Sequence, residues 1–286
     1  MGAVLGENRY GKAEIRLLRV DRDTERHVLH DLEVSVALSG DMEAVHLQGD
    51  NAAVLPTDTQ KNTVYAFARE HGVGEIEDFG SRLARHFVDG TPSVRRARVH
   101  VEEHTWERLG DAPHSFVQSR RDLRTATATA DEDGERMLSG VRGLVLLSST
   151  GSEFRGFLTD RYTTLEETSD RILCTSVDAT WRHTSRPADW GASHATARDA
   201  LTSAFADTYS RSLQQTLFAM GERLVTACDG VAEVRLTLPN RHHFLVDLEP
   251  FGLDNPGEVF HVDDRPFGLI EGTVLADGAD PDGEAW

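Results

Sequence analysis

The sequence repeats one order of segments, and this repeat most restricts the folds that the chain can adopt. In each half, alternating apolar and polar residues predict two strands, apolar residues at helical spacing then predict helices, and two further alternating segments follow. The segments of the first half are residues 11–20, 34–39, 59–71, 76–88, 94–106 and 114–123. Those of the second half are residues 143–149, 170–181, 195–227, 234–238 and 244–248, with one or two helices in residues 195–227. Two successive ββααββ units predict a duplicated α+β protein whose antiparallel sheets carry helices on one face.

The segments between these elements define the expected domains. Residues 131–135 are acidic with one glycine, which is typical of a hairpin tip or linker, so we expect one domain over residues 1–135 and a second over residues 136–286. Residues 47–55 are expected to be extended, and the proline and asparagine in residues 239–243 predict a turn. The Gly/Asp/Pro-rich tail, residues 276–286, is expected to be disordered.

Charge and composition restrict the partners of the chain. Thirty Lys and Arg against 48 Asp and Glu give a formal net charge of −18, which disfavours nucleic acid and anionic membranes as partners. No apolar run approaches the roughly 18 residues that cross a bilayer, and the N-terminal segment lacks the pattern of a secretory signal. The two cysteines, Cys174 and Cys228, fit a reducing compartment rather than a disulfide framework. A small anionic substrate remains compatible, because a pocket can be locally positive.

The segment from Val54 to Tyr65 carries the first candidate site. An apolar run ends at Pro56, and Thr57-Asp58-Thr59 then supplies side chains suited to capping the helix that follows. Backbone N–H groups at such a junction point outward beside a hydroxyl that can take part in chemistry. On this segment alone, an ordinary capped helix start is the favoured explanation of the residues.

Other clusters are weak when each is taken alone. Lys12 on a strand and Arg171 are of types that usually lie on the surface, and Phe154 is of a type that usually lies in the core. The sequence has 13 histidines, but HVEEH at residues 100–104 does not follow the order of zinc proteases, and we expect no metal site. Dinucleotide-binding, Walker and α/β-hydrolase motifs are also absent, so nucleotide cofactors have no support.

Five motifs together resemble one family, urate oxidase (uricase). They are RYGK (residues 9–12), TDTQKNTVY (57–65), FxGFLxDxYTTLxETxDRIL (154–173), VDATW (177–181) and LPNRHHF (238–244). The resemblance extends from Arg9 to Thr273 and implies two tandem T-fold (tunnelling-fold) domains. It also implies oxidation of urate by O₂ to 5-hydroxyisourate and H₂O₂ without metal or organic cofactor. In this family four chains form a tetramer with a tunnel, and the active sites lie at subunit interfaces.

The resemblance assigns four residues to the grip on urate. Arg171 and Gln214 match the clamp on the edge of the urate ring, where a planar guanidinium can make two parallel hydrogen bonds to an anion. Phe154 matches the ring that stacks on the flat substrate. Leu213 falls where the family contributes a backbone N–H.

The resemblance assigns five residues to proton and oxygen handling. Thr57 and Asp58 match the pair that faces urate from a neighbouring subunit, with the backbone N–H of Asp58 as a donor. Lys12, Thr57 and His242 match the proton-relay group of the family, and Asn240 matches the residue that holds O₂ or water over the ring.

Two other functions remain open at this point. The chain could be another T-fold enzyme acting on a purine or pterin, or a purine-binding protein without activity. The former commonly carries metal-ligand histidines and cysteines, and the latter has no need of a proton relay. Eukaryotic uricases often end in a peroxisomal SKL signal, whereas this chain ends in Gly283-Glu284-Ala285-Trp286, so we expect a cytoplasmic location.

Overall fold

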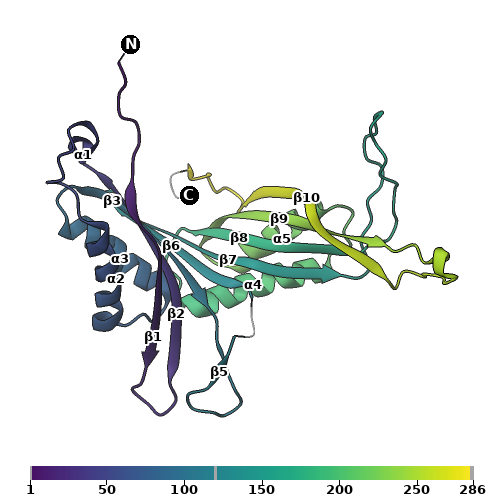
Figure 1. The fold of residues 1–286 in the computed structure, drawn as a ribbon, viewed down its shortest axis with the longest axis horizontal. Helices are drawn as coiled ribbons and strands as arrows, with labels where there is room; N and C mark the ends of the chain where they lie inside the picture. The colour runs from purple at the N-terminus through teal and green to yellow at the C-terminus, as the bar shows by residue number, and fades with distance from the viewer. Residues whose placement is uncertain (1, 119–120, 284–286) are drawn as a thin grey trace. The chain divides into compact units, whose positions relative to one another are not determined.

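A computed structural model describes residues 2–118 and 121–283, and the chain divides into two compact units (Figure 1). Unit 1 contains Met1–Gly140, Arg182–Gly191 and the segment that begins at Asp282. Unit 2 contains Val141–Trp181 and Ala192–Pro281. The boundary between the predicted domains stays a prediction, and each unit is described by itself.

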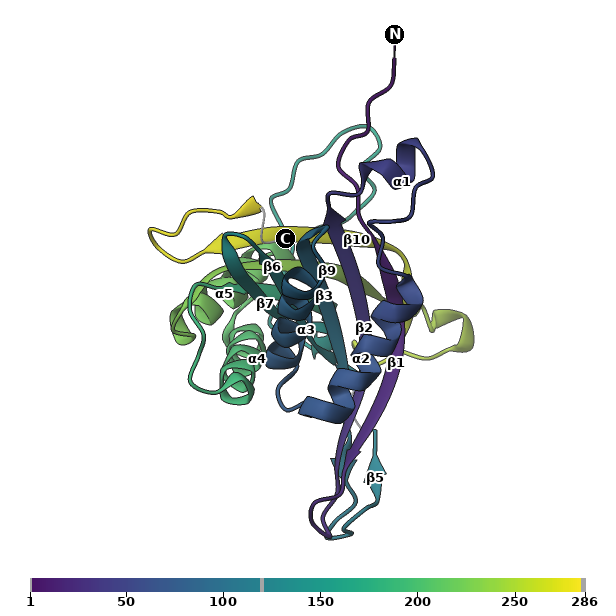
Figure 2. The ribbon, with the colours of Figure 1, turned by 90° about the vertical axis from the view of Figure 1, so that its left-hand side faces the viewer.

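Unit 1 is an antiparallel sheet with helices packed on it (Figure 2). Its strands are β1 (Tyr10–Asp21), β2 (Val28–Gly40), β3 (Val94–His104) and β6 (Leu123–Asp131), which are neighbours in this order, followed by the first part of β7 (Gly134–Ser148). Helix α2 (Thr57–His71) packs on β1, and α3 (Ile76–Gly90) packs on β3 and β6. A short helix, α1 (Glu43–Leu47), follows β2, and β4 (Glu107–Arg108) pairs with β5 (Phe116–Val117).

The core of unit 1 follows from the periodicity of these segments. Along β2, Val34, Val36 and Leu38 are buried at alternate positions, as expected for a strand with one apolar face. The apolar stripe predicted for residues 76–88 is buried on α3, where Phe79, Leu83 and Phe87 face the sheet.

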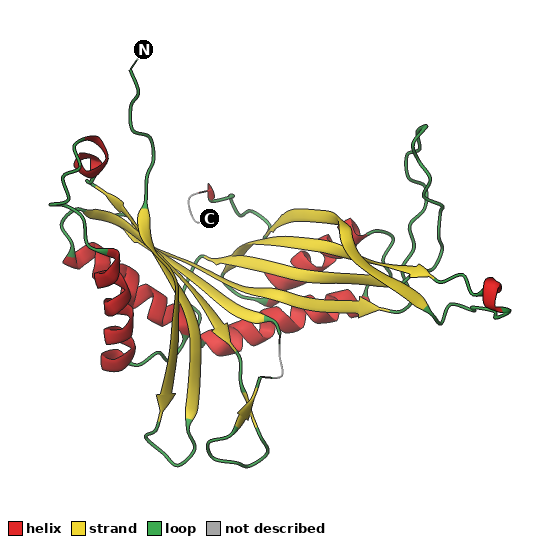
Figure 3. Cartoon of the chain, in the orientation of Figure 1, coloured by secondary structure: helices red, strands yellow, loops and turns green. Residues whose placement is uncertain are grey.

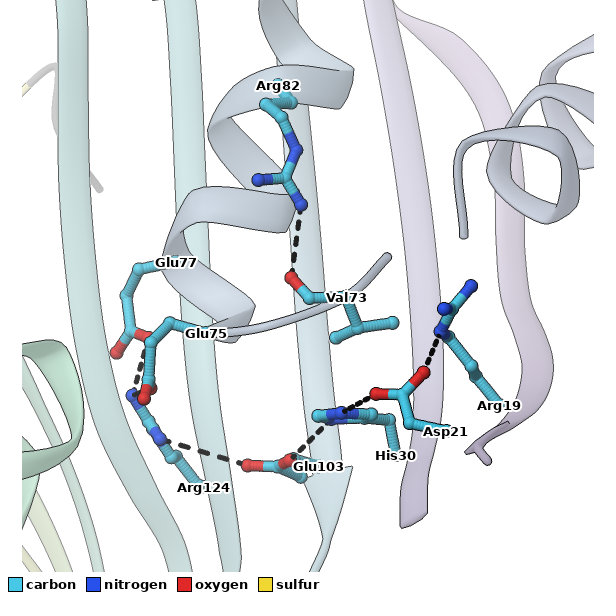
Figure 4. A network of polar contacts seen from close by, with 9 residues as sticks. All are labelled: Arg19, Asp21, His30, Val73, Glu75, Glu77, Arg82, Glu103 and Arg124. Atoms are coloured by element: carbon cyan, nitrogen blue, oxygen red, sulfur yellow. Dashed lines mark hydrogen bonds and ion pairs between the residues drawn. The ribbon is translucent and has the colours of Figure 1, made fainter. Parts of the chain in front are cut away.

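Polar residues also join α3 to its sheet (Figure 4). The Arg124 guanidinium of β6 lies 2.7 Å from a Glu75 carboxylate oxygen, 2.6 Å from one of Glu77 and 3.9 Å from one of Glu103. Glu77 is fully buried and accepts a 2.8 Å hydrogen bond from the Ser139 hydroxyl. Burial raises the pKa of both Glu77 and Glu103, although the Arg124 charge opposes this shift.

Unit 2 repeats the same order of elements. Its sheet has the neighbours β7, β8 (Leu173–His183), β9 (Val231–Leu245) and β10 (Phe260–Leu275), and its helices are α4 (Trp190–Asp207) and α5 (Leu213–Ala227). Helix α5 packs on β9 and β10, and the short helix η1 (Glu249–Phe251) lies between these strands in sequence. A long loop, residues 149–172, joins β7 to β8 (Figure 3).

The ββααββ order is confirmed in both halves, as is the hairpin tip between β6 and β7, but four local predictions are wrong. Residues 114–123 are not one strand, because only Phe116–Val117 pairs and the fourth strand is β6; residues 119–120 lie outside the described residues. Residues 47–55 contain no strand, because Leu47 ends α1 and the residues after it form turns and irregular backbone. The predicted turn at 239–243 lies inside β9, where Pro239 is opposite Leu269 of β10. The strand predicted at 244–248 is therefore only the end of β9, which stops at Leu245, and the last strand of the second half is β10. Of the predicted disordered tail, Glu284–Trp286 lie outside the described residues.

Candidate active site

Unit 1 holds one group of the predicted site residues at the start of α2. Thr57 is the first residue of this helix and Asp58 the second, while Lys12 lies half-buried on β1. The capping prediction is wrong, because Pro56 occupies the N-cap and no side chain caps the helix. The Gln60 N–H donates to the Pro56 carbonyl at 3.1 Å, and the earlier N–H groups of this turn have no side-chain cap.

The Asp58 carboxylate does not cap the helix start but hydrogen-bonds to side chains one turn further along α2. One of its oxygens accepts a 2.5 Å hydrogen bond from Lys61 Nζ, and the other accepts a 3.0 Å bond from Asn62 Nδ2. The hydrogen bond from Lys61 is the main reason that the pKa of Asp58 is lowered, and the charge of Lys12 adds a smaller effect.

Unit 2 holds a second group in the loop between β7 and β8. The backbone N–H of Arg171 donates to the Ser152 carbonyl at 2.9 Å, and Arg171 Nε lies 3.3 Å from Ser152 Oγ. Phe154 and Thr168 exchange backbone hydrogen bonds of 2.9 and 3.1 Å. These bonds hold the Arg171 guanidinium 5.2 Å from the centre of the Phe154 ring, and Phe157 stacks on the same ring at 5.0 Å. Burial lowers the pKa of Arg171, but a guanidinium remains charged at any physiological pH.

Helix α5 begins beside this loop. Ser210 N–H donates to the Gly151 carbonyl at 3.0 Å, and Glu153 N–H donates to the Ser210 carbonyl at 2.8 Å. These two bonds bring Leu213 and Gln214, the first two residues of α5, to the Phe154–Arg171 loop. Leu213 is buried and Gln214 is exposed, so only the latter side chain is accessible to a ligand.

A capping box fixes the start of α5. The Ser212 hydroxyl accepts a 3.2 Å hydrogen bond from Gln215 N–H, and Gln215 Oε1 accepts a 2.9 Å bond from Arg211 N–H. This arrangement is close to the S-x-x-Q capping box, which could have been found in the sequence. Ser212 and Gln215 therefore fix the start of α5, where Leu213 and Gln214 lie, and sequence reasoning missed them.

Asn240 and His242 lie on β9, the strand next to β8. Thr175 Oγ1 of β8 donates a 3.0 Å hydrogen bond to the carbonyl of Pro239, next to Asn240. The His242 ring stacks on Phe244 at 5.7 Å with an interplanar angle of 23°. Within the described residues, no hydrogen bond or ring contact joins Asn240 or His242 to the other candidate residues. The structure thus places them in the same unit as Arg171 without direct contact.

The described residues also bear on three other features, namely a metal site, a disulfide and a membrane-spanning helix. Across residues 2–118 and 121–283, no group of three or more His, Cys, Asp or Glu side chains could hold a metal ion. His100 instead lies 2.8 Å from Thr127 Oγ1 and 3.3 Å from a Glu102 oxygen. Cys174 and Cys228 are free, buried thiols. In the same part of the chain, none of the helices has the length and apolarity needed to span a membrane.

Comparison with known proteins decides the family. The sequence profile of uricase matches residues 8–129 and 137–271, which is most of the chain. The chain belongs to the uricase family. The uricase of Arthrobacter globiformis is 48% identical over 283 residues, covering 99% of this chain and 93% of that protein. The uricase of Aspergillus flavus is 37% identical over 286 residues, covering 93% of this chain and 95% of that protein.

The fold agrees with the same family. The crystal structure of uricase from Arthrobacter globiformis superposes with a TM-score of 0.95 at 48% identity, covering 99% of this chain and 98% of that one. The resemblance read from five motifs is therefore confirmed, and so is the α+β fold of two tandem T-fold domains.

Proposed function

We propose that this chain oxidises urate with O₂ and water to 5-hydroxyisourate and H₂O₂, and that it needs neither metal nor organic cofactor. The uricase match over nearly the whole chain is the observation that carries this proposal. The chemistry is feasible because urate, once deprotonated, is electron-rich enough to reduce O₂ by single-electron steps. The protein then has to fix the anion, remove a proton and keep O₂ close.

The loop and the helix start of unit 2 form the grip on urate in this proposal. Arg171 makes two parallel charge-assisted hydrogen bonds to the anion, and Gln214 bonds the neighbouring edge of the ring. Phe154 stacks on the purine plane, and Leu213 contributes its backbone N–H, which a buried side chain does not hinder. The capped start of α5 and the two bonds that Arg171 donates to Ser152 support these positions, because both fix the groups before the substrate arrives.

Lys12, Thr57 and His242 handle the proton, and Asn240 holds O₂ or water over the ring. An amine can accept a proton from a threonine hydroxyl that is itself bonded to urate, and an imidazole can pass a proton through water. Thr57 and the backbone N–H of Asp58 face the anion because they belong to the first turn of α2, which is the positive end of the helix dipole.

We further propose a homotetramer in which unit 1 of one subunit and unit 2 of another complete each active site. The terminal strands of the sheet order, β1 and β10, support this assembly, because apolar side chains lie exposed on them in the single chain. Leu18 on β1 is 59% exposed, and Leu269 on β10 is 54% exposed. Neighbouring subunits would cover such edges. The cytoplasmic location remains a prediction.

One experiment tests the reaction. The purified protein is dialysed against a chelator and mixed with urate in air, and the loss of urate absorbance, the uptake of O₂ and the formation of H₂O₂ are followed together. We expect equal amounts of urate and O₂ to be consumed, with no gain when metals are added back. Activity that disappears with the chelator would contradict the cofactor-free reaction. Turnover of a pterin in place of urate, or tight urate binding without turnover, would favour the two alternatives.

A further inference from the structure

The Tyr10 hydroxyl joins the start of β1 to the chain that enters α2. It donates a 3.1 Å hydrogen bond to the Leu55 carbonyl and accepts a 3.0 Å bond from the Leu55 N–H. These residues are 45 positions apart in the sequence. A single side chain therefore satisfies both backbone groups of Leu55 and fixes this residue to the strand.

Gln60 supports the same residue from the helix side. Its side chain is fully buried, and its Nε2 donates a 3.3 Å hydrogen bond to the Leu55 carbonyl. Burial raises the pKa of Tyr10 more than its hydrogen bonds with Leu55 and Gln60 lower it. The phenol therefore stays protonated at neutral pH, as it must in order to donate and accept at the same time.

The position of this contact relates it to the proton-transfer residues. Tyr10 lies two residues before Lys12 in the regular part of β1, before the bulge between Lys12 and Ile15, so both side chains leave the same face of the strand. Leu55 likewise lies two residues before Thr57. The hydrogen bonds between Tyr10 and Leu55 therefore lie two residues from Lys12 along β1 and two residues from Thr57 along the segment entering α2.

Strand β1 is also fixed to its neighbour β2. Gly11 pairs with Ala37 of β2, and a Cβ added at Gly11 would lie 1.8 Å from the Val36 carbonyl oxygen. Only glycine permits this approach. Because β1 is fixed to β2 at Gly11, the hydrogen bonds of Tyr10 fix Leu55, and so the segment entering α2, to the same sheet.

We propose that Tyr10 is a positioning residue, which sets the separation of Lys12 and Thr57 for proton transfer by fastening β1 to the segment entering α2. This role rests on the proposed function. Proton transfer needs donor and acceptor within hydrogen-bond reach, and a small displacement of either group costs much of the rate. Most of the proposed grip on urate lies on Phe154, Arg171 and Gln214 of unit 2, so urate binding depends less on this bond than proton transfer does.

The test compares two Tyr→Phe variants, each of which removes a hydroxyl that joins β1 either to α2 or to the segment entering α2. Tyr10→Phe keeps the ring but loses both bonds to Leu55, and we expect kcat to fall roughly tenfold while KM for urate stays within about twofold. The control is Tyr65→Phe, which loses a 3.2 Å bond to the Arg16 carbonyl further along the same helix and strand. We expect this control to keep the kcat of the unmodified enzyme.

A second comparison separates positioning from general support of the fold. In a Lys12→Met background, Tyr10→Phe should cause little further loss of kcat, because the proton transfer that it positions is already absent. A residue that only stabilises the fold would lower kcat by the same factor in both backgrounds. If Tyr10→Phe fails to fold, Gln60→Met removes the other side-chain bond to the Leu55 carbonyl, and its kcat should fall while KM is kept.

The role of Tyr10 would be overturned if the two Tyr→Phe variants had equal kcat. It would also be overturned if Tyr10→Phe raised KM as much as it lowered kcat, or if Tyr10→Phe lowered kcat by the same factor in the Lys12→Met background as in the unmodified enzyme. For Gln60→Met, an unchanged kcat would count in the same way. An unmodified enzyme that does not consume urate would instead overturn the proposed function.

Discussion

At the scale of single residues, the choice of lysine at position 12 is informative. Among the 30 basic residues of the sequence, only Lys12 and Lys61 are lysines, and both act on the charge of Asp58. An amine can release a proton, whereas a guanidinium in a protein does not. The chain thus uses arginine for nearly all its positive charge but keeps lysine where the proposed reaction needs a proton acceptor.

We therefore predict that Lys12→Arg and Lys12→Met both lower kcat by roughly 10²- to 10⁴-fold, with a much smaller change in urate binding. Retention of the charge should not rescue Lys12→Arg. Lys61→Arg is the matched control, since arginine can keep the ion pair with Asp58 and Lys61 has no assigned part in proton transfer. Steady-state kinetics and a urate-binding measurement check this. Equal losses in turnover and binding, or an active Lys12→Arg, would remove Lys12 from the relay.

Arg171 offers a second test at this scale. Arg171→Lys keeps a positive charge but cannot make two parallel hydrogen bonds, so we expect KM for urate to rise roughly 10- to 100-fold. Arg155→Lys, an exposed residue of the same loop that lies 3.8 Å from Glu167, is the control and should leave KM unchanged. An unaltered KM in Arg171→Lys would exclude the bidentate contact.

Motifs in the sequence assign roles to single residues, and these roles stay predictions, whereas a contact with a distant backbone group leaves no mark in the sequence. The hydroxyl of Tyr10 bonds Leu55, 45 positions away, and nothing in either local pattern indicates this. The capping prediction at Thr57 failed because Pro56 already occupies the N-cap, which leaves Asp58 to pair with Lys61. The cap at Ser212 was readable, because its partner is three residues away.

At the scale of secondary-structure elements, prediction failed where a strand has no exposed face. Along β6 the threonines at alternate positions are buried as fully as the alanines between them, so no contrast of apolar and polar residues marks the strand. In β9 the turn-forming residues at 239–243 are kept extended by pairing with β10, a contact that no local pattern contains. The two longer helices of unit 1, α2 and α3, were predicted because their apolar residues recur at helical spacing, whereas the short α1 was not predicted.

The Arg124 contacts predict how the elements of unit 1 respond to mutation and pH. Arg124→Leu leaves the buried Glu77 and the part-buried Glu103 without their cation, so we expect the free energy of unfolding to fall by about 3–5 kcal/mol at neutral pH. Arg95→Leu, which removes an exposed ion pair with Asp41, should change stability little. Denaturant unfolding of the two variants gives the comparison.

The same variant has a defined pH dependence. Both glutamates have a folded-state pKa above the ordinary 4.5, so the folded state binds more protons between 4.5 and the raised pKa, and stability falls as pH rises through this window. Loss of Arg124 raises these pKa values further. The destabilisation should therefore be larger at pH 8 than at pH 5, and an equal loss at both values would show that the network acts through packing alone.

At the scale of the whole molecule, the duplication could be predicted from segment order, but the partners of the edge strands could not. Exposed apolar side chains on β1 and β10 become evident only when the strand order is known. The candidate residues divide accordingly, with Lys12, Thr57 and Asp58 in unit 1 and the others in unit 2. If two chains complete each site, variants damaged in different units can restore activity to each other, which is not expected if each site lies within one chain.

Two inactive variants should restore activity to each other. Lys12→Met damages the unit 1 half of a site and Arg171→Ala damages the unit 2 half, so each pure enzyme has only defective sites. If unit 1 of one subunit faces unit 2 of another, random hybrid tetramers made by co-expression should have about a quarter of their sites with both halves intact. We expect roughly that fraction of the unmodified kcat, whereas mixing the two folded enzymes without subunit exchange should give none. Hybrids without activity, or full activity in an isolated monomer, would place all site residues of each active site in one chain.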